Sequence, residues 1–195
     1  MRLKGWSSHV VACAAVATAA AGAAAQEKPA PEISAFRADA DTFISAAQPH
    51  ANFGRARLLR ADGSPQATVY LRFRLQSVRG EIVSVTLLLH TQAGARAAYQ
   101  VRRVDRDGWR EDRLTYENAP HLSLRFAASK PVRRGSWSAV DVTPFVDARD
   151  GKVSLAITTR SPAEVSFASR ETNRGPRLVV RTGDDDGSGA RSAGT

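Results

Sequence analysis

Two stretches of the sequence place arginine beside tyrosine within strand-like runs. The residues concerned are Tyr70, Arg72 and Arg74 in the first stretch and Tyr99, Arg102 and Arg103 in the second. A guanidinium group can meet a carboxylate through two parallel hydrogen bonds, and an aromatic ring can stack on the apolar face of a sugar. If both strands belong to one solvent-facing sheet, these residues predict a basic, aromatic platform for an acidic carbohydrate. The alternative for each arginine is an ion pair with a buried acid or the protection of a strand edge.

Two carboxylates, Asp39 and Asp41, are separated by one residue at the start of another strand-like run. Glycoside hydrolysis uses a pair of carboxylates, but here a second face would have to supply a partner. Such a pair more commonly begins a strand, where it caps exposed backbone N–H groups or helps to hold a structural calcium ion. The sequence therefore predicts no cofactor, with a structural calcium at Asp39 and Asp41 as the open alternative.

Catalytic motifs are not found in the sequence. The histidines outside the leader, His50, His90 and His121, do not stand at a two-histidine metal spacing, and no Gly-x-Ser-x-Gly elbow occurs. A polysaccharide lyase would need a tyrosine or histidine base near an arginine that neutralises a uronate. Tyr70 and Arg72 are of the right types, but types alone do not define a site. We therefore predict that the chain is not an enzyme and keep a lyase as the less favoured alternative.

Alternating apolar and polar residues predict the elements that position these side chains. Apolar residues recur at every second position over 69–75 and again over 83–89, which is typical of half-buried antiparallel strands. His90 ends an outward-facing set and is expected in solvent. Turn-forming residues bound the runs, and no long stripe of helical period is present. The pattern predicts an all-β antiparallel sandwich. The other expected strands cover 43–45, 58–60, 99–104, 137–142, 153–159, 165–169 and 178–181.

The N-terminal segment has the features of a secretory leader. Arg2 and Lys4 precede an apolar run over 10–21 that ends in alanines at 23–25, so residues 1–25 are predicted to be a cleaved signal peptide. A lipoprotein cleavage box at Cys13 is the alternative. We further expect a Pro-rich spacer at 26–35, one folded domain at 36–182 and an acidic, Gly/Ser-containing tail at 183–195. The mature protein would be secreted, monomeric, without cysteine and without membrane insertion.

The charge is basic and consists almost entirely of arginine. The 195 residues include 28 Lys and Arg against 19 Asp and Glu, a formal net charge of +9. Such a surface attracts polyanions whatever the fold. An exported chain meets little nucleic acid, and the arginines are scattered over many strands rather than gathered in one stripe with stacking aromatics. These features favour an acidic polysaccharide and exclude nucleic acid as the partner.

Several short motifs, in their joint order, resemble carbohydrate-binding module family 96, also called the DNRLRE or disaggregatase-related domain. In the first half these are 41–44 (DTFI), 52–54 (NFG), 58–60 (LLR), 70–75 (YLRFRL) and 83–89 (VSVTLLL). In the second half they are 109–111 (WRE), 114–120 (LTYENAP), Trp137 with 140–143 (VDVT), 165–171 (VSFASRE) and 176–180 (PRLVV). The resemblance covers about residues 36 to 182.

The resemblance implies a secreted β-sandwich of jelly-roll type that serves as an accessory module beside polysaccharide-degrading or cell-surface domains. Alginate-like acidic glycans are among the ligands reported for the family. Trp109 and Trp137 belong to the family pattern, and we expect both in the core or as loop anchors. This chain departs from the pattern in two ways: it carries no catalytic neighbour, and Arg74 replaces the common aspartate after Tyr-Leu-Arg-Phe.

Together these observations predict a secreted, non-catalytic carbohydrate-binding module for an acidic, uronate-type polysaccharide. The alternative is a structural or adhesive module of the cell surface or matrix that binds protein partners, because the same sandwich can serve both roles.

Overall fold

The computed structural model describes residues 32–183, except 77, 79, 95–96, 148 and 150. The expected signal peptide, most of the spacer and nearly all of the tail lie outside the described residues. The first strand begins at Glu32, so residues 32–35, which were expected in the spacer, are part of the fold. The strands are β1 (Glu32–Ser45), β2 (Leu58–Gly63), β3 (Gln66–Arg74), β4 (Glu81–Gly94), β5 (Gln100–Val104), β6 (Leu122–Ala128), β7 (Trp137–Asp141), β8 (Lys152–Thr158), β9 (Val165–Ala168) and β10 (Arg177–Gly183), with a 3-10 helix, η1 (Thr143–Phe145).

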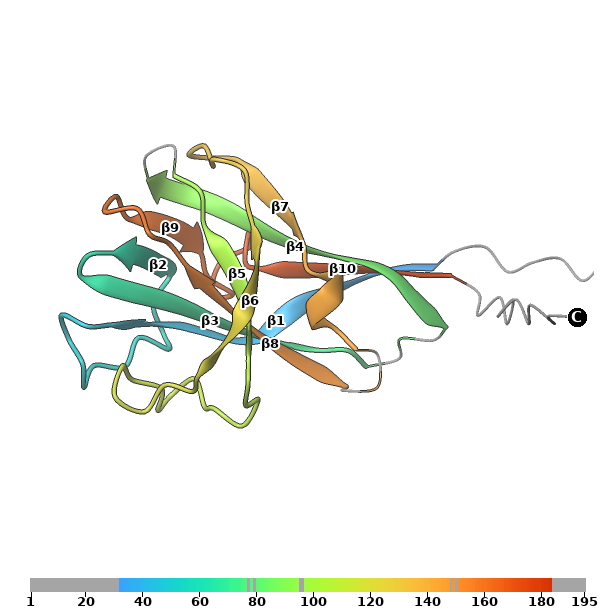
Figure 1. Cartoon of the computed structure of the whole chain (residues 1–195), viewed down its shortest axis with the longest axis horizontal. Helices are drawn as coiled ribbons and strands as arrows, with labels where there is room; N and C mark the ends of the chain where they lie inside the picture. Colours follow the sequence, from blue (N-terminus) through green and yellow to red (C-terminus); the bar gives the residue numbers. More distant parts are fainter. Residues whose placement is uncertain are drawn as a thin grey trace, which may run out of the picture.

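The strands pair only in antiparallel ladders within the described part of the chain (Figure 1). Six of them close into a ring in the order β1, β10, β4, β9, β2, β3 and back to β1. From β3 the sheet continues through β8 and β5 to β6, while β7 pairs with β4. This arrangement confirms the predicted all-β antiparallel fold and is compatible with a jelly-roll sandwich.

Strand β1 belongs to two sheets. Its residues 32–37 pair with β10, and from Ala38 onward it pairs with β3, with a bulge at Asp39. A bulge bends the strand and increases its twist, which lets one strand pass from one layer to the other. Asp39 and Asp41 therefore lie where the two layers join.

The core lies between the layers and contains the apolar residues that the alternation identified. Val69, Leu71 and Phe73 of β3 and Val85 and Leu87 of β4 have no exposed surface. Their neighbours along each strand face outward, because successive side chains of a strand point to opposite faces. Each layer therefore has an inner face that forms the core and an outer face. The alternation of side chains does not reveal whether that outer face is exposed or covered by another segment.

The two outer faces differ. On the layer containing β3, β8 and β5, a second apolar cluster is buried beneath the segment 105–121; it includes Tyr70, Trp109, Leu114 and Ala156. On the layer of β7, β4, β10 and β1, the outward residues Ile33 and Trp137 are 68% and 43% exposed. One outer face is covered, and the other is open.

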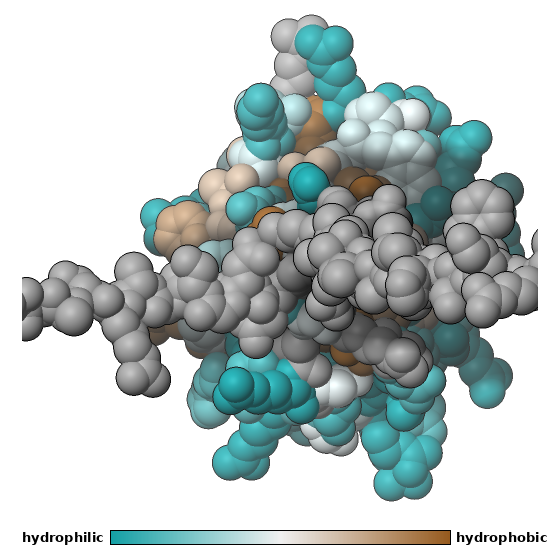
Figure 2. All heavy atoms as spheres, turned by 90° about the vertical axis from the view of Figure 1, so that its right-hand side faces the viewer, coloured by the Kyte–Doolittle hydropathy of each residue, from teal (hydrophilic) through white to brown (hydrophobic). Residues whose placement is uncertain are grey.

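Hydrophilic side chains project around the margin of the end of the molecule shown in Figure 2, with hydrophobic surface between them. The described residues contain no helix that is long and apolar enough to cross a membrane.

Candidate functional site

The segment 105–121 is fastened to the outer face that it covers. Trp109 Nε1 donates to Ser154 Oγ of β8 at 3.1 Å, and the Tyr70 hydroxyl of β3 donates to the carbonyl oxygen of Pro120 at 3.1 Å. The Tyr70 and Trp109 rings meet edge to face, with centroids 6.0 Å apart. These two donors, Trp109 Nε1 and the Tyr70 hydroxyl, have their acceptors, and satisfied buried polar groups favour one arrangement. The segment is therefore a fixed cover.

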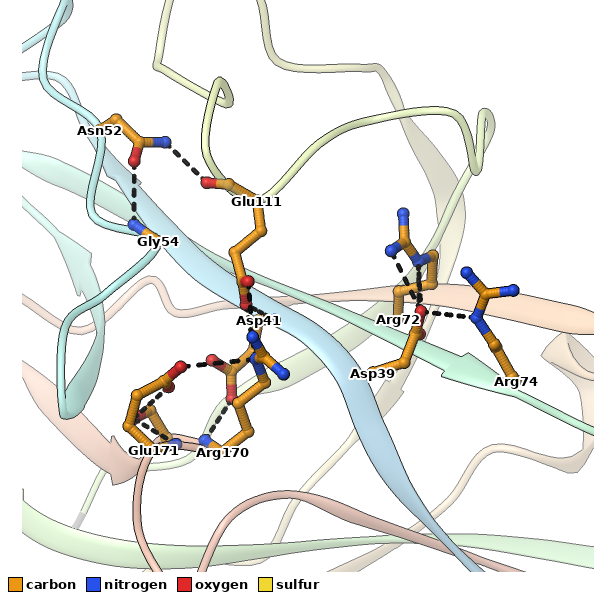
Figure 3. A network of polar contacts seen from close by, with 10 residues as sticks. Asp39, Asp41, Asn52, Gly54, Arg72, Arg74, Glu111, Arg170 and Glu171 are labelled. Atoms are coloured by element: carbon orange, nitrogen blue, oxygen red, sulfur yellow. Dashed lines mark hydrogen bonds and ion pairs between the residues drawn. The ribbon is translucent and has the colours of Figure 1, made fainter.

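A polar network joins this cover to β1 and to the segment between β9 and β10 (Figure 3). Glu111 pairs with the guanidinium group of Arg170 through two hydrogen bonds of 2.8 Å, and its Oε1 also accepts from the backbone N–H of Asp41 at 2.8 Å. Asp41 Oδ2 in turn accepts from the backbone N–H of Arg170 at 2.7 Å. Three segments that are distant in the sequence are thus linked by charge-assisted hydrogen bonds.

The Asp41 carboxyl group is buried, with 1% of the residue exposed, and its Oδ1 is without a partner among the described residues. Burial raises the pKa of Asp41 to about 7, against the lowering effect of the Arg170 N–H, and the negative charges of Glu171 and Glu111 raise the pKa further. Desolvation is therefore the dominant cause, and the group carries a proton in mildly acidic solution.

The loop that contains Phe53 is built against the same network. Asn52 Nδ2 donates to the carbonyl oxygens of Glu111 and Leu114, each at 2.8 Å, and Asn52 Oδ1 accepts from the N–H of Gly54. A Cβ atom at Gly54 would clash with the carbonyl oxygen of Glu111, so the close approach requires glycine here. The loop is therefore held in one conformation.

The open outer face combines an aromatic ring with several arginines. Trp137 of β7 stands against the buried His90 ring, edge to face at 5.2 Å, and the Arg177 guanidinium carbon lies 5.3 Å from the Trp137 ring centroid. Arg177 and Arg181 of β10 point outward with Val179, because Leu178 and Val180 between them are in the core. The ladder register places Arg37 of β1 directly opposite Arg177.

These arginines have no acidic partner in the part of the chain that the structure describes. Arg37, Arg177 and Arg181 take part in none of its ion pairs. Like charges directly opposite each other on neighbouring strands are destabilising. The Arg37–Arg177 pair therefore leaves a positive charge that an external anion could neutralise. We refer to Arg37, Trp137, Arg177 and Arg181 as the open-face cluster.

The model of carbohydrate-binding module family 96 matches residues 32–182, which is most of the chain. The chain belongs to this family. A comparison with curated proteins gave no significant match. The family assignment confirms the resemblance and establishes a carbohydrate-binding module. Asp41, Asn52, Glu111 and Arg170 lie in four of the motifs that carried the resemblance, and the polar network brings these motifs together.

The two tyrosines expected on a sugar-binding platform are in the interior of the module. Tyr70 and Tyr99 are 2% and 1% exposed, and the Tyr99 hydroxyl lies 2.7 Å from Ser138 Oγ. Burial raises the pKa of each hydroxyl to about 12. Neither ring face is available to a sugar, and the expectation that they stack on one is wrong. The cause is the cover over Tyr70 and the inward direction of Tyr99, whose ring packs on Phe167.

Arg72 and Arg74 both form ion pairs with Asp39 of the module itself. An ion pair with an acid of the protein was the alternative predicted for each arginine. Asp39 Oδ2 is 3.1 Å from Arg72 Nη2 and 2.9 Å from Arg74 Nε. Arg72 also donates to the carbonyl oxygen of Trp109 and lies over the Trp109 ring. Arg72 therefore helps to hold the segment 105–121 in place, whereas the side chain of Arg74 is 60% exposed.

Arg102 and Arg103 lie on opposite faces of β5. Arg102 stacks on Phe126 and donates to the carbonyl oxygens of Ser123 and Leu124 on β6. Arg103 pairs in register with the core residue Leu155 and donates to the carbonyl oxygen of Phe145. Although β3 and β5 belong to the same sheet, the six expected residues do not form one platform.

Asp39 and Asp41 also do not converge on a common site. Asp39 binds Arg72 and Arg74, whereas Asp41 binds the backbone of Arg170. No group of three or more His, Cys, Asp or Glu side chains that could hold a metal ion occurs among the described residues. A structural calcium ion at this pair stays a prediction.

The sequence reasoning missed the open-face cluster. Trp109 is buried as expected, but Trp137 is exposed, and His90, expected in solvent, is only 3% exposed because Trp137 and its neighbours cover it. Arg177, Val179 and Arg181 alternate with the core residues Leu178 and Val180. This alternation could have predicted that the two arginines face outward.

Tyr70→Phe tests the structural role of the tyrosine. Removing the hydroxyl leaves the Pro120 carbonyl oxygen without its donor, so the free energy of unfolding should fall by about 1 kcal/mol. Urea denaturation measures this loss. Retention by an acidic polysaccharide should not change, and weaker retention at unchanged stability would contradict the assignment of Tyr70 to the core.

Proposed function

We propose that this chain is a secreted, non-catalytic, monomeric module that binds an acidic polysaccharide of the uronate type, such as alginate, through the open-face cluster. The family establishes carbohydrate binding, and the proposal adds the class of carbohydrate, the site and the export that the leader predicts.

The Arg37–Arg177 pair is the observation that carries the proposal. The two cationic side chains occupy opposing positions on β1 and β10 without an acidic partner among the described residues. A carboxylate between them would replace the repulsion with charge-assisted hydrogen bonds, for which the planar guanidinium group is suited. Neutral sugars offer no such gain, so the site favours uronates.

Trp137 supplies the other component of a carbohydrate site. Its ring is half-exposed and is held in place by the His90 ring and the Arg177 guanidinium group. A fixed aromatic ring can stack on a sugar with little loss of side-chain entropy. Between Trp137 and Arg37, the strands β7, β4, β10 and β1 form a continuous surface on which an extended chain can lie.

Affinity electrophoresis in gels containing alginate, pectate or a neutral β-glucan tests this proposal. We expect retardation by the two uronate polymers that weakens as salt is added, because exposed charges are screened. Arg37→Gln combined with Arg177→Gln should weaken binding about tenfold or more, the equivalent of one lost charge-assisted contact, without loss of stability. Trp137→Ala should also weaken it.

Arg125→Gln is the matched control for Arg37→Gln alone, because each substitution removes one positive charge from an exposed position. Equal losses for Arg125→Gln and for Arg37→Gln would show that net charge alone acts and would overturn the assigned site. Retention by none of the polymers would favour the structural or adhesive alternative. A rise in ultraviolet absorbance from unsaturated uronates would contradict the non-catalytic role.

A further inference from the structure

A groove of about 700 Å³ lies at the end of the module where β1 ends and β2 and β3 form a hairpin. Phe43 and Phe53 contribute apolar surface, and Gln48, Arg57, Asp62 and Glu164 contribute polar groups. Its volume is within the range of about 300–1,000 Å³ typical of small-molecule sites, which combine apolar walls with a few polar groups. In Figure 1, β2 and the β2–β3 hairpin lie at the left, away from β10.

An aromatic ring faces this groove in a fixed position. Phe53 stacks on Phe43 with centroids 4.1 Å apart and an interplanar angle of 15°, so one face of Phe53 is covered and its exposed surface belongs to the rest of the ring. Its neighbours Asn52 and Gly54 are hydrogen-bonded to each other, and Asn52 also binds the carbonyl oxygens of Glu111 and Leu114. The loop therefore presents Phe53 with little freedom to lose on binding.

Arg57 gives the groove a cationic group that is available to a ligand. Its side chain makes no ion pair or hydrogen bond within the described residues, whereas its carbonyl oxygen accepts from the Ser169 N–H at 3.1 Å and fixes the backbone. The neighbouring Arg60 is 3.7 Å from Glu164, a long contact between half-exposed side chains that holds it weakly. The groove thus offers one free guanidinium group beside acceptors for hydroxyl groups.

We infer that this groove is a second carbohydrate site, distinct from the open-face cluster, that takes the end of a uronate oligosaccharide. The sugar ring stacks on Phe53, and its carboxylate pairs with Arg57. Gln48, Asp62 and Glu164 supply hydrogen-bond partners for hydroxyl groups. A module with an extended face and an end-binding groove can hold two segments of polymer, which raises its overall avidity.

Isothermal titration of the full chain with a uronate trisaccharide prepared from alginate, and with maltotriose as the neutral probe, tests the inference. We expect the uronate to bind and the neutral sugar to bind at least fivefold more weakly. Arg57→Gln should weaken uronate binding fivefold or more, and so should Phe53→Leu. The matched control is Arg55→Gln, an exposed arginine on the same loop outside the groove, which should leave the affinity within twofold.

The inference is independent of the proposed function and can fail alone. If the wild-type chain is retained by alginate gels but Arg57→Gln and Phe53→Leu leave trisaccharide affinity unchanged, the groove is not a site. Absence of trisaccharide binding, or equal binding of maltotriose, would also overturn it. Conversely, Trp137→Ala should weaken polymer retention and leave trisaccharide binding to the groove intact. If Phe53→Leu lowers stability in urea denaturation, Arg57→Gln alone decides.

Discussion

Glu111→Ala should lower the free energy of unfolding by about 3 kcal/mol. The substitution removes both hydrogen bonds to Arg170 and the acceptor for the Asp41 N–H, and it leaves the partly buried guanidinium group with only a longer contact of 3.5 Å to Glu171. Breaking a buried ion pair typically costs 3–5 kcal/mol. The lower end applies here, because 20% of the Glu111 side chain and 38% of the Arg170 side chain are exposed. Urea denaturation followed by tryptophan fluorescence measures the change.

The neighbouring Asp112→Ala is the control. Asp112 pairs with Arg110 at the surface of the same segment, where both side chains are 61% exposed, so its removal should not change stability measurably. If Glu111→Ala is as stable as Asp112→Ala, the polar network does not hold the cover in place. If Glu111→Ala lets the segment 105–121 move, the loop that presents Phe53 should loosen with it, because Asn52 donates to the backbone carbonyl oxygen of residue 111.

The stability of the protein should fall as the pH rises from about 4 to 7. The pKa of Asp41 is about 7 in the folded state and 3.8 in its ordinary, solvated state, chiefly because of burial. Between these values the folded state binds one more proton than the unfolded state, so each rise in pH favours unfolding. The dependence ends above pH 7, where both states have lost the proton. A shift of this size corresponds to about 4 kcal/mol.

The measurement is the urea midpoint as a function of pH for the wild type and for Asp41→Asn. An amide does not titrate, so Asp41→Asn should lose most of the pH dependence between 4 and 7. Asp147→Asn, which replaces an exposed carboxyl group, should keep the wild-type profile. An Asp41→Asn profile that runs parallel to the wild type would show that another group is responsible.

The strands and the core could be predicted from the sequence because strand periodicity is a local property. The apolar residues Val69, Leu71 and Phe73 occupy every second position, and all three are fully buried. The resemblance to the family could also be recognised from the sequence, and the family model matches residues 32–182. The fold class required no knowledge of which strands pair.

The sequence placed the candidate site on residues that the structure does not leave open. It paired arginine with an aromatic ring at Tyr70 and Arg72, and the segment 105–121 lies over both. Trp137 was expected in the core or as a loop anchor because of the family resemblance, and it is exposed on the edge strand β7. The sequence could not show that one of these residue sets is covered and that the other stands on an open face.

The sequence by itself determined which residues face inward on each strand, the all-β class and the family. Only the tertiary structure decided which outer face is open, because alternation assigns a side chain to a face and does not reveal whether another segment lies over it. That cover depends on contacts between distant residues, such as Asp41 with Glu111, 70 positions apart, and Asp41 with Arg170, 129 positions apart. Such pairings leave no periodic signal in the chain. They fix Arg72 beneath the segment 105–121, whereas on the other face Arg37 is exposed and Arg177 is half-buried.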